Sequence, residues 1–342
     1  MSGQDGRRAM TMRSSSALSA RITIVALCLA LLLLGGVGLS VGSAGWQSPW
    51  AVPTSAGLGQ IMWEIRAPRT LGAMLVGALL GLGGAVAQGL FRNPLAEPYL
   101  LGSSSGAALG MALMLSFGMP DALVATTGGR MSLTGAAFIG AVGGVSLSLM
   151  LARGAAHTMR LLLGGVVVGV VLGALTQLLM VWSASAWRIM QAFMLGHTAL
   201  LGWQACGLMA AVLCLTLPVA MALARVLDAL SLGEDAARTL GIPLGLTRAV
   251  LVAVLALSTG AAVAQAGLVA FVGLVAPHLV RARAGARHGI LLFLSTLMGA
   301  VLLVAADILS RLVLAPQELP VGVLTAVLGG TYLLWLLHRR RT

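Results

Sequence analysis

The chain has 342 residues, of which 59% are hydrophobic and only 9% are charged, and its mean hydropathy is +1.00. A soluble domain cannot bury that much apolar surface, so the composition predicts a polytopic helical membrane protein. The apolar runs are continuous and do not alternate, which excludes a transmembrane β-barrel. The net charge of +12 comes from arginines that lie between the apolar runs, which argues against a nucleic-acid-binding surface.

Residues 1–21 form a basic leader with four arginines and one acid, Asp5, and we expect this leader to be disordered and cytoplasmic. The apolar run at 22–39 follows it. The small residues Gly42-Ser43-Ala44 would suit cleavage of a signal peptide. We favour a first transmembrane helix, because many further spans follow and no soluble domain remains to be secreted.

We predict an all-α protein with about ten transmembrane helices in a single membrane domain at 22–338, followed by a basic cytoplasmic tail at 339–342. The expected spans lie at about 22–41, 70–90, 99–117, 131–151, 161–181, 201–224, 249–266, 269–280, 290–307 and 321–337. The eighth is too short to cross a bilayer alone, so the seventh and eighth could form one bent unit.

Ten spans place both termini on the same side of the membrane. With the termini inside, 16 of the 21 arginines fall in cytoplasmic segments, as the positive-inside rule requires. The other five lie outside, and they are Arg66, Arg69, Arg130, Arg188 and Arg311. The sequence therefore predicts that both termini are cytoplasmic.

A polar stretch at about 229–241 separates two apolar runs and is predicted to form a short helix. Ser231 to Gly233 can cap this helix, Glu234 and Asp235 lie near its positive end, and Gly241 can stop it. Its apolar residues fall on one face at helical spacing, namely Leu232, Ala236, Ala237 and Leu240. Such a helix suits docking on a soluble partner, and a solvated loop is the alternative.

Further motifs lie on both sides of this stretch. Arg92-Asn-Pro-Leu-Ala-Glu-Pro98 contains two prolines that fix a tight turn, and Leu101-Gly-Ser-Ser-Ser-Gly106 follows it. Gly267-Leu-Val-Ala-Phe-Val-Gly-Leu-Val-Ala-Pro-His-Leu-Val-Arg281 comes later. The last third of the chain holds Asp307-Ile-Leu-Ser-Arg311 and Glu318-Leu-Pro-Val-Gly322. From the residues alone, a structural role is the plainer interpretation of each.

Together with Leu232-Gly-Glu-Asp-Ala-Ala-Arg-Thr-Leu-Gly-Ile242, these motifs resemble those of the FecCD-type ABC importer permeases. These are the inner-membrane subunits that import siderophores, haem and cobalamin. The resemblance spans residues 60–338 and implies the fold of a type II ABC importer permease. One departure is Gly330-Thr331, where many relatives have Gly-x-Pro, and it leaves the local shape of the last span open.

The resemblance implies roles for three sets of residues. An ATPase would dock on the coupling helix, at Leu232, Gly233, Glu234, Ala237, Leu240 and Gly241. A periplasmic binding protein would dock on Arg66, Arg69 and Arg311. The translocation path would be lined by Gly165, Gly169, Gly173, Thr176 and Gln177, together with a short outer helix at about 187–197.

The residues also allow plainer interpretations of the outer arginines. Arg66 and Arg69 could reach lipid phosphates or Glu64. Arg311 could pair with Asp307, which lies four residues earlier on the same helix.

By resemblance, the chain would work in the bacterial inner membrane as a homodimer with two cytoplasmic ATPase subunits and one periplasmic binding protein. It would contact membrane lipid and no nucleic acid. ATP and Mg²⁺ would bind to the ATPase, because a P-loop needs a lysine and this chain has none. We expect no catalytic residue, cofactor or metal site on the chain itself.

The expected cargo is haem first, a ferric siderophore second and cobalamin third. The alternative function is an ion-coupled secondary transporter without an ATPase partner. Such carriers hold buried acids along their path, and Asp307 is the only acid within an expected span. An intramembrane enzyme lacks support, because the five histidines show no paired ligand spacing.

Overall fold

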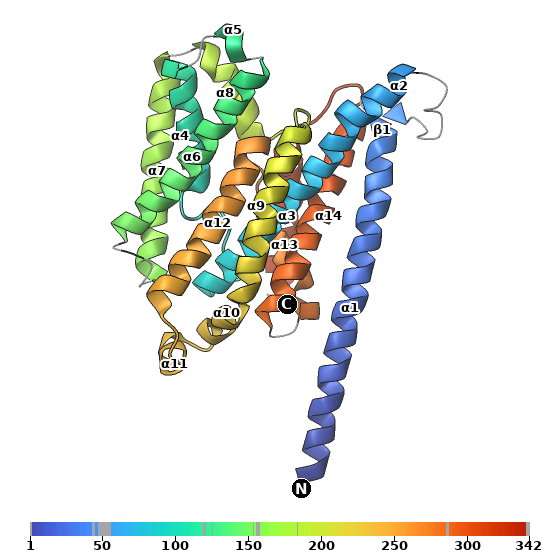
Figure 1. Cartoon of the computed structure of the whole chain (residues 1–342), viewed down its shortest axis with the longest axis vertical. Coiled ribbons are helices and arrows are strands. Elements are labelled where there is room, and N and C mark those ends of the chain that lie inside the picture. Colours follow the sequence, from blue (N-terminus) through green and yellow to red (C-terminus); the bar gives the residue numbers. More distant parts are fainter. Residues whose placement is uncertain are drawn as a thin grey trace.

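The computed structural model describes residues 2–42, 45–46, 56–118, 121–124, 126–152, 154, 158–182, 184–284 and 287–339. Helices make up most of this part of the chain and run side by side as one bundle (Figure 1). A two-stranded antiparallel ribbon, β1 (Val41–Gly42) with β2 (Gly45–Trp46), is attached to it. The predicted all-α class is confirmed.

Ten helices correspond to the ten predicted spans. They are α1 (Ser2–Ser40), α3 (Ala67–Phe91), α4 (Ser103–Leu113), α6 (Thr127–Leu151), α7 (Thr158–Trp182), α9 (Trp203–Ala222), α12 (Leu244–Ala266), α13 (Val272–Ala284), α14 (His288–Leu312) and α15 (Val321–Arg339). Seven helical segments of the described chain are long and apolar enough to cross a membrane alone. Helix α13 has only 13 residues, as expected for the eighth span.

The remaining elements are short and lie at the two ends of the bundle. They are α2 (Ala56–Ile61), the π-helical turns η2 (Met62–Arg66) and η3 (Met114–Gly118), α5 (Asp121–Val124), α8 (Ala184–Leu195), α10 (Ala224–Ser231) and α11 (Glu234–Thr239). Figure 1 shows α2, α5 and α8 at one end, here called the α8 end. Helices α10 and α11 lie at the other end, called the α11 end, toward which both termini point. Helix α8 matches the predicted short outer helix.

The N-terminal leader is helical, and the expectation that it is disordered was wrong. Helix α1 begins at Ser2 and continues into the first span without a break. Once the apolar span is helical, each further residue adds one hydrogen bond to an existing helix, which costs far less than nucleating a new one. The leader contains no proline to stop this extension.

Helix α3 lies at the centre of the bundle and packs against α14 at backbone contact. A Cβ atom at Gly77 would overlap the carbonyl of Gly299, and one at Gly81 would overlap the carbonyl of Ser295. Helices α4 and α6 meet in the same way at Gly106 and Gly140. Small residues four apart allow this close approach.

Candidate functional site

The polar stretch at 229–241 folds into the end of α10 and the separate helix α11, where a single helix was predicted. Gly233 has a φ of +119°, a conformation that side chains other than glycine rarely adopt, and it breaks the helical backbone. Ser231 does not cap α11, because its Oγ donates to the Asp228 carbonyl at 2.6 Å within α10. The N-cap of α11 is Gly233 itself.

The end of α11 is a Schellman motif centred on Gly241. The Gly241 N–H donates to the Arg238 carbonyl at 2.9 Å, and the Ile242 N–H donates to the Ala237 carbonyl at 3.3 Å. Gly241 has a φ of +74°, as this motif requires. The predicted stop at Gly241 is confirmed.

Glu234 ties α11 to the membrane helices. Its Oε1 accepts hydrogen bonds from Arg248 Nη2 at 2.7 Å and from Thr158 Oγ1 at 3.3 Å, and Arg92 Nη2 lies 4.0 Å away. Thr158 begins α7, Arg248 lies on α12 with a side chain only 1% exposed, and Arg92 caps the end of α3. One carboxylate therefore connects α11 to three helices of the bundle.

The charge state of Glu234 follows from these neighbours. Burial by itself disfavours the ionised form, but the hydrogen bond and charge of Arg248 outweigh it, with help from Thr158 and Arg92. The pKa of Glu234 is therefore held below its ordinary value of 4.5. At neutral pH the carboxylate is ionised and holds α11 in place.

The apolar residues of the stretch do not share one face, so that prediction was wrong. Ala237 is fully buried against the bundle, whereas Leu232 and Leu240 are 75% and 66% exposed. The reason is that Leu232 precedes the break at Gly233 and Leu240 follows the last residue of α11. Two large apolar side chains thus point away from the protein on both sides of an anchored helix.

At the α8 end, Asp307 of α14 is the centre of a buried ion-pair cluster. Its Oδ1 lies 3.0 Å from Arg69 Nε and accepts a hydrogen bond from Thr198 Oγ1 at 2.5 Å. Its Oδ2 pairs with Arg311. Arg69 also lies 2.8 Å from Glu318, whose side chain is 27% exposed. The cluster joins α3, α14 and the segments that follow α8 and α14.

The three arginines on which a binding protein was expected to dock, Arg66, Arg69 and Arg311, all have partners within the chain. Arg311 is 1% exposed, and its Nη1 donates to the carbonyls of Gly38 and Val41. Arg66 donates to the Leu39 carbonyl at 3.2 Å. Arg66 and Arg311 therefore anchor the end of α1, and the alternative in which Arg311 pairs with Asp307 is found. Docking of a binding protein on these arginines stays a prediction.

The predicted path residues of α7 do not all share one environment. Gly165 packs against the carbonyl of Leu100, whereas Gly173 has open space on its side-chain face. Thr176 is buried and donates to the Leu172 carbonyl at 2.8 Å. Gln177 is exposed, and with Thr176 it lines a cavity of about 340 Å³ against α8. Gly169, in between, approaches Ser105 of α4.

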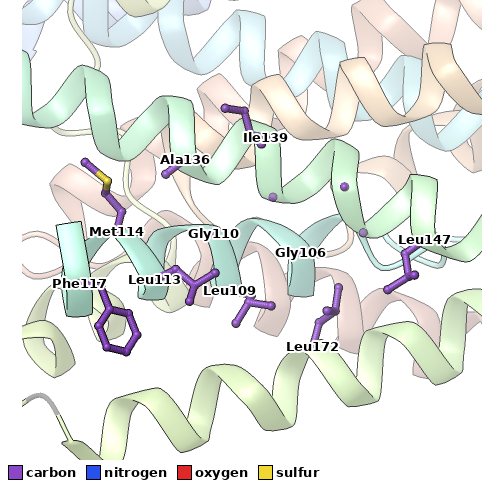
Figure 2. A pocket seen from close by; sticks show the side chains of 13 residues that line it. Gly106, Leu109, Gly110, Leu113, Met114, Phe117, Ala136, Ile139, Leu147 and Leu172 are labelled. Atoms are coloured by element: carbon purple, nitrogen blue, oxygen red, sulfur yellow. The ribbon is translucent and has the colours of Figure 1, made fainter. Parts of the chain in front are cut away.

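A larger crevice of about 570 Å³ opens between α4, α6 and α7 (Figure 2). Its wall includes Gly106, Gly110 and Ile139, and Phe117 stands at one end with 75% of its surface exposed. Every side chain that lines it is apolar. Ligand sites need a few polar groups to orient the ligand, so this crevice is not a candidate site.

Several residues of these two sites were missed from the sequence. Arg92, Thr158 and Arg248 hold Glu234, while Thr198 and Glu318 complete the Asp307 cluster. Each charged one lies at the edge of an apolar run, where an opposite charge is expected nearby. The sequence does not show which acid meets which base, because the partners are up to 249 residues apart.

Among the described residues, no three His, Cys, Asp or Glu side chains come together as metal ligands.

A bundle of membrane helices with an anchored helix at one end and an ion-pair cluster at the other defines a multi-pass membrane protein. The chain belongs to the FecCD transport family, whose model matches residues 22–339. Its relatives are transport permeases, and the chain is accordingly a transport subunit and not an enzyme.

Two curated relatives and two solved structures illustrate the likeness. The hemin transport system permease protein HmuU of Yersinia pestis is 38% identical over 92% of this chain and 93% of that protein. The vitamin B12 import system permease protein BtuC of Escherichia coli is 40% identical over 92% of this chain and 95% of that protein.

The structure of a metal-chelate type ABC transporter in an inward-facing conformation superposes with a TM-score of 0.83 at 28% identity, covering 93% of this chain and 99% of that one. PsaBC from Streptococcus pneumoniae, at a TM-score of 0.56 and 17% identity over 83% of this chain and 92% of that one, shares the fold alone.

Proposed function

We propose that this chain is the transmembrane subunit of an ABC importer that carries an iron chelate or tetrapyrrole into the cytoplasm, with haem as the first candidate. The relatives support this cargo class, since one is named for hemin and another for vitamin B12. Their identities to this chain differ by only two points, 38% against 40%, so sequence similarity does not rank the two cargoes. A ferric siderophore remains the second candidate.

The observation that carries the proposal is the anchored α11. A coupling element must expose a surface to the ATPase and must be fixed to the helices that move. Leu232 and Leu240 provide exposed apolar side chains, and Glu234 fixes α11 to α3, α7 and α12. In this proposal an ATPase binds the two leucines, and a displacement of α11 by the ATPase is transmitted to the bundle through the contacts of Glu234. Gly233 and Gly241 set the angle at which α11 leaves the membrane domain.

At the α8 end, we assign docking of the periplasmic binding protein to the region of Arg69. Glu318 is the most accessible member of the Asp307 cluster, and it covers one nitrogen of Arg69. An acidic side chain of the binding protein would compete with Glu318 for that nitrogen. Arg66 and Arg311 would then act indirectly, by holding the end of α1 beside the docking region.

The path is assigned to the exposed face of α7 in a homodimer. Large apolar side chains follow this face along most of the helix, including Leu163, Val170 and Val181. A second copy packed against it would leave Gly173 and Gln177 beside the central space. Both termini lie toward the α11 end, which supports a bacterial inner-membrane protein with cytoplasmic termini.

ATP-dependent uptake tests the proposal. The chain is co-purified in mild detergent with its ATPase, reconstituted in proteoliposomes, and supplied with haem-loaded, siderophore-loaded or cobalamin-loaded binding protein. We expect one cargo to enter only with ATP and Mg²⁺. Uptake without an ATPase, driven by an ion gradient, would reject the importer in favour of an ion-coupled carrier.

The variant L232S/L240S tests the coupling surface in the same preparation. Serine at these exposed positions leaves the bundle intact, so we expect loss of the retained ATPase and of uptake together. L246S, equally exposed but on the first turn of α12, is the matched control. An ATPase that stays bound to L232S/L240S would show that it docks elsewhere.

A further inference from the structure

We propose that a pocket between α1, α10 and the start of α14 binds the headgroup of an anionic phospholipid. The pocket has a volume of about 770 Å³ and lies toward the α11 end. Three arginines from three separate segments line it, namely Arg21, Arg225 and Arg287. The inference rests on the membrane-spanning helices and is independent of the transported cargo.

The three arginines lie at the same depth in the membrane. Arg21 is 19 residues before the end of α1 at Ser40, which at 1.5 Å per residue is about 28 Å. Arg225 follows the end of α9 by three residues, and Arg287 directly precedes α14. Since the hydrocarbon core of a bilayer is about 30 Å thick, all three guanidiniums reach the level of the lipid headgroups.

The pocket carries a net positive charge. Within the described chain, none of the three guanidiniums forms an ion pair or a hydrogen bond with another residue. The one acid that lines the pocket is Asp228. Its Oδ1 accepts the His288 N–H at 2.8 Å and lies 2.7 Å from His288 Nδ1. Asp228 is thus engaged with His288, and the arginines are available to an anion.

The rest of the pocket suits an acyl chain. Ile24 of α1, Met221 of α9 and Ile290 and Phe293 of α14 form an apolar wall on the membrane side of the arginines. Gly289 at the start of α14 also lines the pocket, and a Cβ there would make ordinary van der Waals contacts with Ala224 and Met221. The His288 N–H at the start of α14 already donates to Asp228, so it is the next N–H groups of that first turn that have no acceptor within the helix and favour a further negative charge. A free phosphate would contact the arginines and leave this apolar wall exposed, so the features together select a phospholipid.

Lipid binding by the full-length chain in mild detergent tests the proposal. Native mass spectrometry is used to titrate the protein with phosphatidylglycerol and with phosphatidylcholine of the same acyl chains. One basic residue near a membrane surface changes the binding constant about fivefold. We therefore expect one phosphatidylglycerol site that R225Q/R287Q weakens about 25-fold, with phosphatidylcholine binding unchanged. Inorganic phosphate in excess should leave the lipid bound.

Two control variants separate charge from folding. R225K/R287K keeps the charge and should keep most of the preference for phosphatidylglycerol. Arg160→Gln removes an exposed arginine at the same end of the bundle but outside the pocket, and it should bind like the wild type. Equal affinity of the wild type for both lipids, or equal loss in R160Q, would overturn the proposal. Displacement by inorganic phosphate would overturn the assignment to a lipid.

Discussion

Replacing Glu234 by glutamine tests whether α11 is held by its carboxylate. The change keeps the size of the side chain but removes its negative charge. That charge faces Arg248 at 2.7 Å, Thr158 at 3.3 Å and Arg92 at 4.0 Å. A hydrogen bond to a charged group contributes about 1.5–3 kcal/mol, and Arg248 makes its bond where its side chain is 1% exposed. We therefore expect α11 to leave its docked position about 10 to 150 times more often.

Hydrogen exchange measures this opening directly in the full-length protein. The amides of Ala237, Gly241 and Ile242, which are bonded within or just after α11, should exchange faster by that factor in E234Q. Asp235→Asn is the matched control, since Asp235 is the neighbouring acid of the same short helix and is exposed. Unchanged protection in E234Q, or an equal loss in D235N, would refute the anchoring role.

The same anchor predicts a pH dependence. Because the folded pKa of Glu234 lies below the ordinary value of 4.5, its stabilising contribution is complete above pH 4.5. The contribution is lost as the pH falls through the lower folded value. Protection of α11 in the wild type should therefore be constant from neutral pH down to about 5, and it should decrease in more acidic solution. E234Q should show no such change.

Three further changes probe the outer cluster, the helix contacts and the Schellman motif. Asp307→Asn removes the charge shared by two buried guanidiniums and should destabilise the detergent-solubilised protein by about 3–5 kcal/mol. Thr198→Val removes one hydrogen bond and should destabilise it by about 1–3 kcal/mol. Thermal unfolding of the two variants compares these losses. Gly77→Ala places a Cβ against a backbone carbonyl of α14 and should reduce the yield of folded protein in membranes, while Gly173→Ala, which meets open space, should not. Gly241→Ala should cost about 1–2 kcal/mol at its left-handed backbone, seen as faster exchange in α11 alone.

The helices could be predicted from the sequence because each is a long apolar run between polar or glycine-rich segments. Gly241 could be predicted as a helix stop for the same kind of local reason, since only glycine readily adopts the φ of +74° found there. The cap of α11 was predicted within Ser231 to Gly233, and Gly233 takes that position, whereas the separate helix α10 that ends at Ser231 was not predicted. The prediction that Leu232, Ala237 and Leu240 share one face assumed one continuous helix. The break at Gly233 makes that assumption wrong.

The electrostatic contacts could not be predicted because they depend on tertiary packing. Nothing local joins Glu234 to Thr158, which lies 76 residues earlier, or Arg69 to Asp307, which lies 238 residues later. The pairing of Arg311 with Asp307 was foreseeable, since residues four apart on a helix are neighbours. The burial of this pair was not, because it depends on the end of α1 covering Arg311.

Helix α3 relates the two sites to each other. Its first turn carries Arg69 of the Asp307 cluster, and Arg92 at its end faces Glu234 beside α11. Its 25 residues span about 37 Å, and its glycine contacts with α14 leave no room for the two helices to move closer. A displacement of α11 that pushes α3 toward α14 must therefore shift the two helices together, or bend them, and either movement reaches Asp307. Exchange of the Leu201 amide, bonded to the Thr198 carbonyl near this cluster, should then respond to ATPase binding in the wild type but much less in E234Q. An equal response in both proteins would show that the two ends communicate by another route.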